Sequence, residues 1–236
     1  MKLKSKFSKT IKYIIDDFFP PFIRDTRLFY RPIIKIWNNK MDMDFKVKAH
    51  KMTEYEFIQA YEALVPMRAT DNTPDTIDFV IQNVIGKSVL EVGCGNGDVS
   101  YLCAKKGLKT MATDIALGNL NELKSKFDTE KFDFKTKVAN VENLPFDNNS
   151  FDTSICLHTL EHVRNLNQAI SELKRVTKKR IIIIVPKQRY SRYTEDYHLN
   201  FFGSPDQLEL AMGIAKSSCI VKDYCLCFLW TFNILF

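Results

Sequence analysis

The chain has 236 residues, enough for one α/β domain with a buried core and a modest additional segment. Its composition, 45% hydrophobic and 26% charged, excludes a wholly disordered chain. The longest uncharged apolar run covers residues 224–236, whereas a membrane-spanning helix needs about 20 such residues. We therefore expect no transmembrane segment. The basic N-terminus also lacks the small-residue cleavage site of a secretory signal.

The six cysteines are scattered along the chain and form no CxxC pair. Several lie in apolar, strand-like runs, where cysteine usually serves as a small core residue. This pattern favours reduced thiols in a cytoplasmic protein over disulfide bonds or a zinc knuckle.

Positive charge is concentrated at the N-terminal end of the chain. Residues 1–51 hold 13 Lys and Arg against 5 Asp (+8), and residues 52–236 hold 21 against 23 acidic residues (−2), which together give +6. Apolar residues at helical spacing predict a short amphipathic helix before Pro20, through Ile11, Ile14, Ile15, Phe18 and Phe19. Three roles stay open for residues 1–70: a packed helical cap, a substrate-binding lid, or a peripheral contact of residues 1–37 with the inner membrane face.

From residue 73 onward, strand and helix patterns alternate. Thr73-Pro74 and Ser204-Pro205 each predict the start of a helix. Strands are expected at 88–92, 110–114, 132–138, 153–157 and 181–185, and further helices at 99–103, 117–127 and 166–176. This alternation predicts that residues 71–236 form an α/β domain with a Rossmann-like, doubly wound, mostly parallel sheet behind an N-terminal helical extension. Residues 220–236 suit a closing hairpin but lack a Gly, Pro or Asn-Gly turn signal, so six or seven strands are expected.

A glycine-rich turn follows the first expected strand. In a doubly wound sheet, ligands bind beyond the carboxyl ends of the strands. The chain there reads Glu91-Val92-Gly93-Cys94-Gly95-Asn96-Gly97-Asp98. Glycine permits a positive φ and a close approach of a ligand to the backbone, and the next helix presents free N–H groups. The third glycine of a dinucleotide site would fall at Asp98, so the pattern is GxGxG preceded by an acid. An incidental turn is the alternative reading.

Polar residues also follow the next strands. Asp114 ends the second strand, 23 positions after Glu91, and a carboxylate there can accept two hydrogen bonds from a ribose diol. Three further segments stand in order along the chain: ANVENLPF at 139–146, FD at 151–152 continuing to ICLHTLEHV at 155–163, and YHLNFFGSPDQL at 197–208.

Together these segments resemble the class I S-adenosylmethionine-dependent methyltransferases, and within them the type 11, ubiquinone/menaquinone-biosynthesis-like subgroup. The resemblance implies S-adenosylmethionine as cofactor and S-adenosylhomocysteine as product. It implies that Asp114 binds the ribose, that Val141 offers its backbone N–H to the adenine, and that Asn140 stands where the family usually has an Asp that accepts from the adenine amino group. An amide oxygen can still accept that bond. The residues expected to bind the cofactor are Glu91, Gly93, Cys94, Gly95, Gly97, Asp114, Ile115, Asn140, Val141, Leu157 and, through the cofactor's carboxylate, Arg68.

Two histidines are candidates for a catalytic base. The sulfonium methyl group is already activated, so the enzyme mainly aligns the nucleophile with it, but an oxygen nucleophile also needs a base. His158 at its strand end and His198 in the later segment are the candidates. Equally, both could orient the substrate or a loop. Glu161 and His162 are expected to make structural hydrogen bonds, and no cluster of acids suggests a catalytic metal.

The methyl group is expected to go to an oxygen, or alternatively a nitrogen, of a small molecule. A sugar, nucleotide sugar or other intermediate of cell-surface polysaccharide biosynthesis is the first choice. A quinone or lipid at the membrane surface is the alternative acceptor. A homologue that binds the cofactor without catalysis is a different class that stays open. A nucleic-acid substrate is disfavoured, because the chain lacks the Asp/Asn-Pro-Pro-Tyr segment of amino-group DNA methylation. The sequence does not give the oligomeric state.

Overall fold

The computed structural model describes residues 18–29, 31–32, 42, 44–67, 72–127, 132–190, 192, 197–214 and 218–232. Most of the amphipathic helix predicted before Pro20 lies outside these residues, and so does Arg68. None of the helices that the structure describes is long and apolar enough to cross a membrane.

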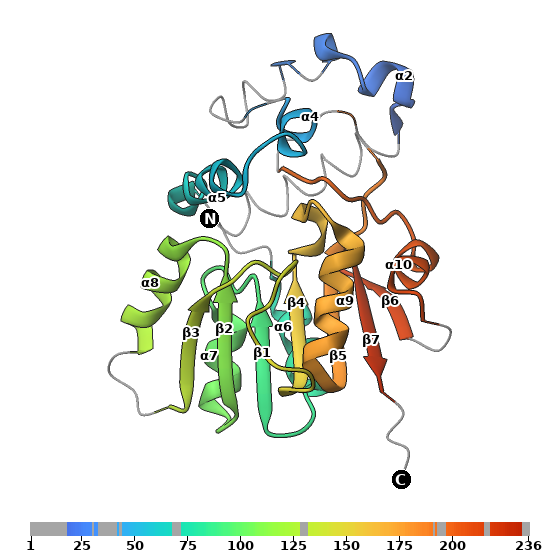
Figure 1. Ribbon diagram of the computed structural model, residues 1–236. Coiled ribbons are helices and arrows are strands. Elements are labelled where there is room, and N and C mark those ends of the chain that lie inside the picture. Colours follow the sequence, from blue (N-terminus) through green and yellow to red (C-terminus); the bar gives the residue numbers. More distant parts are fainter. Residues whose placement is uncertain are drawn as a thin grey trace.

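Within the described residues, seven strands form one sheet in the order β3-β2-β1-β4-β5-β7-β6 (Figure 1). Their bounds are β1 Ser88–Val92, β2 Lys109–Asp114, β3 Phe134–Val138, β4 Phe151–Leu157, β5 Thr177–Pro186, β6 Ser218–Lys222 and β7 Cys225–Thr231. Strands β1 to β5 pair in parallel, and β7 joins β5 and β6 antiparallel. The predicted Rossmann-like, mostly parallel sheet is confirmed. Because the strand order reverses between β1 and β4, the carboxyl ends of these two strands flank the place where such sheets bind ligands.

The closing hairpin is complete although no usual turn residue marks it. Asp223 and Tyr224 connect β6 to β7 with φ angles of 48° and 62°. Two central residues at positive φ are the conformation of a tight hairpin turn, which Asn-Gly normally supplies. Asp223 also accepts a hydrogen bond from Thr73 Oγ1 at 2.7 Å. Tertiary contacts and strand pairing therefore hold a turn that the residue types do not signal.

Helices cover both faces of the sheet, because alternate residues of its central strands point to opposite sides. Ile182 and Ile184 of β5 pack with α6 (Pro74–Asn83) and α7 (Asp98–Lys105) on one face. Ile181 and Ile183 pack with α9 (Leu166–Val176) and α10 (Pro205–Met212) on the other. Helix α8 (Leu117–Phe127) covers β2 and β3 at the sheet's edge. The helix starts predicted at Thr73 and Ser204 are confirmed, since each side chain accepts a hydrogen bond from a backbone N–H in the first turn of its helix.

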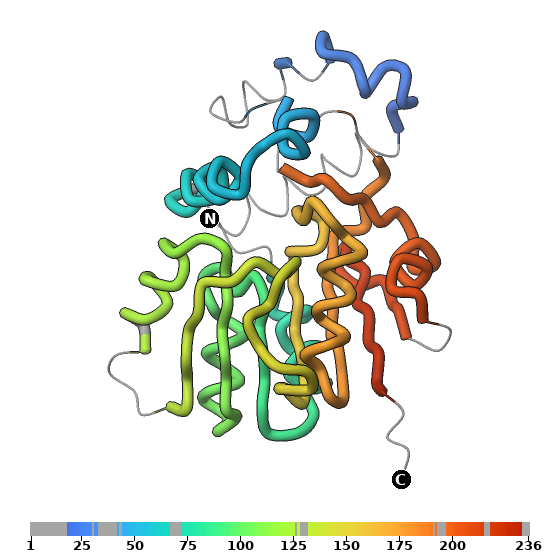
Figure 2. Tube along the Cα trace, in the orientation of Figure 1, coloured from blue at the N-terminus to red at the C-terminus, as the bar shows by residue number. Residues whose placement is uncertain are grey.

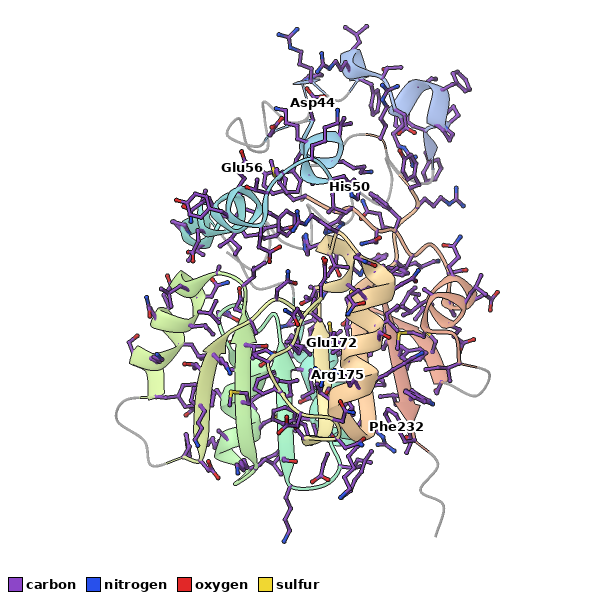
Figure 3. All side chains as sticks on the ribbon, in the orientation of Figure 1. Asp44, His50, Glu56, Glu172, Arg175 and Phe232 are labelled. Carbon is purple, nitrogen blue, oxygen red and sulfur yellow. The ribbon has the colours of Figure 1, made fainter. Side chains whose placement is uncertain are left out.

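Two charged residues of α9 fix the loop that follows β3. Arg175 Nη2 donates to the carbonyl of Leu144 at 2.8 Å, and Leu144 N donates to Glu172 Oε2 at 2.7 Å. Figure 3 labels Glu172 and Arg175, which also pair with each other at 2.7 Å. This clamp holds the loop that carries Asn140 against the body of the domain.

The N-terminal part of the chain lies over the upper edge of the sheet as helices α2 (Pro21–Arg24), α4 (Phe45–Ala49), α5 (Glu54–Glu62) and η1 (Val65–Met67) (Figures 1 and 2). Phe45, Phe57 and Tyr61 of these helices form a small core with Tyr197. The rings of Phe45 and Tyr197 stack with centroids 3.8 Å apart. We call residues 44–67 the cap. It packs on the domain through its own apolar cluster rather than through surface charges alone.

Candidate active site

The glycine turn after β1 has a backbone that only glycine fits well. Gly93 has a φ of 68°, and a Cβ there would stand 2.1 Å from Thr159 Oγ1. Gly97 has a φ of 72° and directly precedes α7. The turn therefore brings a bare backbone and the N-terminus of a helix to the carboxyl edge of the sheet.

Asp114 ties this turn to the neighbouring strand. Parallel pairing of β1 with β2 places the two strand ends side by side. The side chain of Asp114 is 2% exposed, and its Oδ2 accepts from Gly95 N at 2.9 Å while Oδ1 accepts from Ala116 N at 2.9 Å. Since each carboxylate oxygen has two lone pairs, each still has one for a ligand. The carboxylate is thus placed to accept from a pair of hydroxyl groups.

Glu91, which is predicted to contact the cofactor, hydrogen-bonds to the first turn of α7. Its Oε2 accepts from Ser100 N at 2.8 Å and also from Ser100 Oγ, both in α7. Burial raises the pKa of Glu91 to about 7, although the two bonds from Ser100 oppose the rise. The acid before the glycine turn therefore ties α7 to β1.

A hollow of about 520 Å³, partly open to solvent, lies at the carboxyl ends of β1, β2 and β4. Six residues predicted from the sequence line it: Gly93, Asp114, Ile115, Asn140, Val141 and His158. Cys94, Gly95, Gly97, Leu157 and His198 do not line it, and Arg68 lies outside the described residues. The lining that sequence reasoning missed includes Phe57 and Tyr61 of the cap, together with Glu142, Thr159 and His162. The cap thus forms the roof of the hollow, which residue spacing alone could not place.

Asn140 connects the cap to the floor of the hollow. Its Nδ2 donates to Glu54 Oε1 at 2.8 Å, and its Oδ1 accepts from Glu142 N at 3.0 Å. Glu54 in turn pairs with Arg164 at 2.6 Å. Oδ1 keeps a lone pair that can accept from an amino group. An Asp at position 140 would instead place a second carboxylate against Glu54.

His158 lines the hollow but is poorly suited to accept a proton. It sits just after β4 with a φ of 48°, and its Nδ1 is 3.5 Å from Glu161 Oε1. Burial lowers the pKa of His158, but Cys225 and Glu161 outweigh burial and raise it to about 10. A ring that already holds its proton at neutral pH is not a general base. His198 is buried next to Gln188, with Nδ1 2.7 Å from Gln188 Oε1, and does not line the hollow.

Comparison with known proteins agrees with this fold. Residues 90–185 match the methyltransferase domain family. The ubiquinone/menaquinone biosynthesis C-methyltransferase of Rickettsia prowazekii is 34% identical over 110 residues, which are 43% of this chain and 44% of that protein. A ubiquinone biosynthesis O-methyltransferase of Pseudomonas fluorescens is 35% identical over 101 residues, 41% of this chain and 42% of that protein. The chain therefore spans less than half the length of these curated relatives.

A similar fold occurs in a SAM-dependent methyltransferase from Aquifex aeolicus, with a TM-score of 0.54, 18% identity and coverage of 76% of this chain and 98% of that one. Residues 90–185 of this chain are thus similar to a methyltransferase domain, and the chain shares the fold of a SAM-dependent methyltransferase. By their names, the curated relatives that match this stretch act in the biosynthesis of ubiquinone and menaquinone.

Proposed function

We propose that the protein transfers a methyl group from S-adenosylmethionine to an oxygen atom of a small molecule bound beneath the cap. The observation that carries this proposal is the hollow itself. It joins the ends of β1, β2 and β4 to a roof made by Phe57 and Tyr61. A roofed site can exclude water and align two reactants, and alignment supplies roughly 7–11 kcal/mol of the barrier reduction in such transfers.

The described residues fit the cofactor at three points. Asp114 has lone pairs for the ribose hydroxyls, and Asn140 Oδ1 has one for the adenine amino group. Gly93 lets the ligand approach the backbone closely. When bound, the cofactor supplies an electrophilic methyl group on sulfur. Holding and orienting the acceptor falls to the residues of this chain.

The acceptor we propose first is a hydroxyl-bearing metabolite such as a sugar or nucleotide sugar of cell-surface biosynthesis. Supporting this, the lining of the hollow includes the polar residues Glu142, His158, Thr159 and His162. A second candidate is a phenolic quinone precursor. It is favoured by the names of the relatives that act in quinone biosynthesis and by the two aromatic rings of the roof, which suit a planar ring.

A cytoplasmic location is part of the proposal, because all six cysteines are free thiols. Contact with a membrane surface would accompany the quinone candidate. Phe22 and Leu28 are 77% and 88% exposed in the N-terminal part, next to basic residues, so they could lie in the headgroup region.

The test is methyl transfer by the purified full chain. Radiolabelled S-adenosylmethionine is mixed with a panel of nucleotide sugars, free sugars and dihydroxybenzoate-type phenols, and S-adenosylhomocysteine is measured for each. Acceptor-dependent product with one class supports the proposal and identifies that class. If the chain binds S-adenosylhomocysteine tightly but produces none with any acceptor or with a cell metabolite extract, it is a non-catalytic homologue. An anionic vesicle arm tests whether turnover of the phenol class needs a surface.

A further inference from the structure

Three potential metal ligands meet beside the hollow: Glu161, His162 and His198. One ligand atom of each lies within 4.8 Å of the other two. Glu161 and His162 belong to the short helix η2 (Leu160–His162) after β4, whereas His198 comes from the segment before α10. The rings of His162 and His198 have centroids 4.8 Å apart. The fold thus assembles residues that are 36 positions apart in the chain.

Glu161 is a buried carboxylate beside the ring of His158. It is 1% exposed, and neither Oε1 nor Oε2 has a hydrogen-bond partner among the described residues. The nearest cationic group reported for it is His158 Nδ1, at 3.5 Å. Burying a carboxylate without hydrogen bonds is strongly unfavourable unless positive charge is bound close to it. The structural hydrogen bonds that the sequence predicts for Glu161 are made by its backbone carbonyl, which accepts from Leu199 N and Asn200 N.

The two histidines are oriented as metal ligands usually are. Nδ1 of His198 is 2.7 Å from Gln188 Oε1, and Nδ1 of His162 is 3.4 Å from the carbonyl oxygen of Tyr197. Both partners are acceptors, so each Nδ1 carries the hydrogen and each Nε2 carries the lone pair. A hydrogen bond from the second ring nitrogen to a carbonyl is the typical support of a histidine that binds a metal.

The backbone holds the two halves of the cluster together. Leu199 N and Asn200 N donate to the carbonyl of Glu161 at 2.7 and 2.9 Å. Asn200 Nδ2 donates to the carbonyls of Leu160 and Val163 at 3.0 and 2.7 Å. These four bonds fix the segment of His198 on η2, so the ligands are preorganised rather than gathered from mobile chains.

The geometry points to a binding site for one divalent first-row transition-metal ion, with Zn²⁺ as the reference ion, held by Glu161, His162 and His198. Two imidazoles and a carboxylate suit Zn²⁺, Fe²⁺, Mn²⁺ or Co²⁺, whereas Mg²⁺ and Ca²⁺ prefer oxygen ligands alone. Ligands about 2.0–2.2 Å from a tetrahedral ion stand about 3.4 Å apart, so side-chain rotations of roughly an ångström would close the site. Three protein ligands leave a coordination position for a substrate.

The role of the ion rests on the proposed function. His162 lines the hollow, so an ion beside it can bind the acceptor's hydroxyl oxygen. Coordination lowers the pKa of that hydroxyl, and its proton leaves to solvent. The resulting oxyanion attacks the methyl carbon, an O–C bond forms, the S–CH₃ bond breaks, and its electron pair stays on sulfur.

The experiment uses the untagged full chain, stripped with a chelator and dialysed against Zn²⁺, Mn²⁺ or Co²⁺, with bound metal measured by mass spectrometry. We expect one ion per chain and Co²⁺ d–d absorption bands that report nitrogen and oxygen ligation. Glu161→Gln and His198→Asn should each weaken binding at least tenfold. His50→Ala is the matched control, because His50 is an exposed histidine at the end of α4 (Figure 3) that is not in the cluster. It should bind as the native chain does.

S-adenosylhomocysteine binding, measured without metal, checks that each variant is folded. Metal binding is measured without cofactor or acceptor, so its result stands even if no acceptor is ever methylated. A native chain that binds less than one tenth of an ion at tens of micromolar metal overturns the site. So does equal binding by native, Glu161→Gln and His198→Asn chains that all retain S-adenosylhomocysteine. If the ion binds but chelation leaves acceptor turnover unchanged, the site stands and the role assigned to it is wrong.

Discussion

Asp114 holds the glycine turn from the end of the neighbouring strand, with its Oδ2 accepting from the backbone N–H of Gly95 at 2.9 Å. One carboxylate therefore both shapes the turn and faces the hollow. Because the same side chain supports the backbone and meets the ligand, its removal affects cofactor binding in two ways.

Replacement of Asp114 by Ala should weaken S-adenosylhomocysteine binding by at least about 100-fold. Hydrogen bonds to a charged group contribute about 1.5–3 kcal/mol each, and about 1.4 kcal/mol corresponds to tenfold in affinity. Titration calorimetry measures the change, with Asp206→Ala as control, since Asp206 is an exposed Asp in the first turn of α10. An Asp114→Ala chain that binds within threefold of the native one contradicts the assignment.

The buried Glu91 should make stability depend on pH. Its pKa of about 7 lies above the ordinary 4.5, so the folded state holds this proton more tightly than the unfolded state. That contribution is fully present below pH 4.5, falls as pH rises, and is lost above the folded pKa of about 7. The difference is on the order of 3 kcal/mol.

Glu91→Gln removes this titration while keeping an oxygen that can accept from Ser100. The variant should gain stability relative to the native chain between pH 5 and 8, and thermal unfolding of both chains across that range measures it. A constant difference between the two chains at every pH would show that Glu91 does not titrate in this window.

The cap should depend on its apolar cluster more than on its ion pair. Phe57 is 4% exposed and packs with Tyr61, and its ring also lies 4.6 Å from the guanidinium of Arg164. Phe57→Ala should cost about 3–5 kcal/mol of unfolding free energy. Glu54→Ala should cost less than about 1 kcal/mol, because the Glu54 side chain is 54% exposed. Urea unfolding followed by tryptophan fluorescence ranks the two, and the reverse order would refute this account of the cap.

The β6–β7 turn offers a stabilising substitution. Tyr224 has a φ of 62° and is 51% exposed, and a residue with a Cβ loses about 1–2 kcal/mol in that conformation. Tyr224→Gly should therefore raise the unfolding free energy by about 1 kcal/mol. Tyr224→Ala, which removes the ring but keeps the Cβ, is the comparison. If the Tyr224→Gly chain is no more stable than the Tyr224→Ala chain in denaturant unfolding, backbone strain at Tyr224 is not significant.

Periodic features of the sequence predicted most of the domain, for physical reasons that individual elements make plain. The β-branched run at Ile181–Val185 could only be a strand covered on both faces. Thr73 and Ser204 could be recognised as helix starts from local chemistry alone. The β6–β7 turn could not be recognised from local chemistry. Asp223 and Tyr224 adopt left-handed backbone angles there, because pairing between strands that are distant in the sequence stabilises the turn.

The residues of the site also divide into those that the sequence indicates and those that it does not. Gly93 and Asp114 follow strands directly, so the sheet's topology places them and the sequence indicates them. Glu91 has the right position in the chain, but the alternation of strand side chains turns it toward α7. The roof residues Phe57 and Tyr61, and the meeting of Glu161 with His198, depend on how the cap and the segment before α10 dock. No local periodicity encodes such docking.

Asn140 Nδ2 donates a hydrogen bond to Glu54 Oε1, so the residue tolerated at one of these positions depends on the residue at the other. An aspartate at 140 would meet a like charge unless position 54 changed with it. Natural chains that keep this cap should therefore carry the pair as Asn with Glu, or as Asp with a residue that donates a hydrogen bond. Grafting the cap onto a relative would therefore require transferring both residues of the pair.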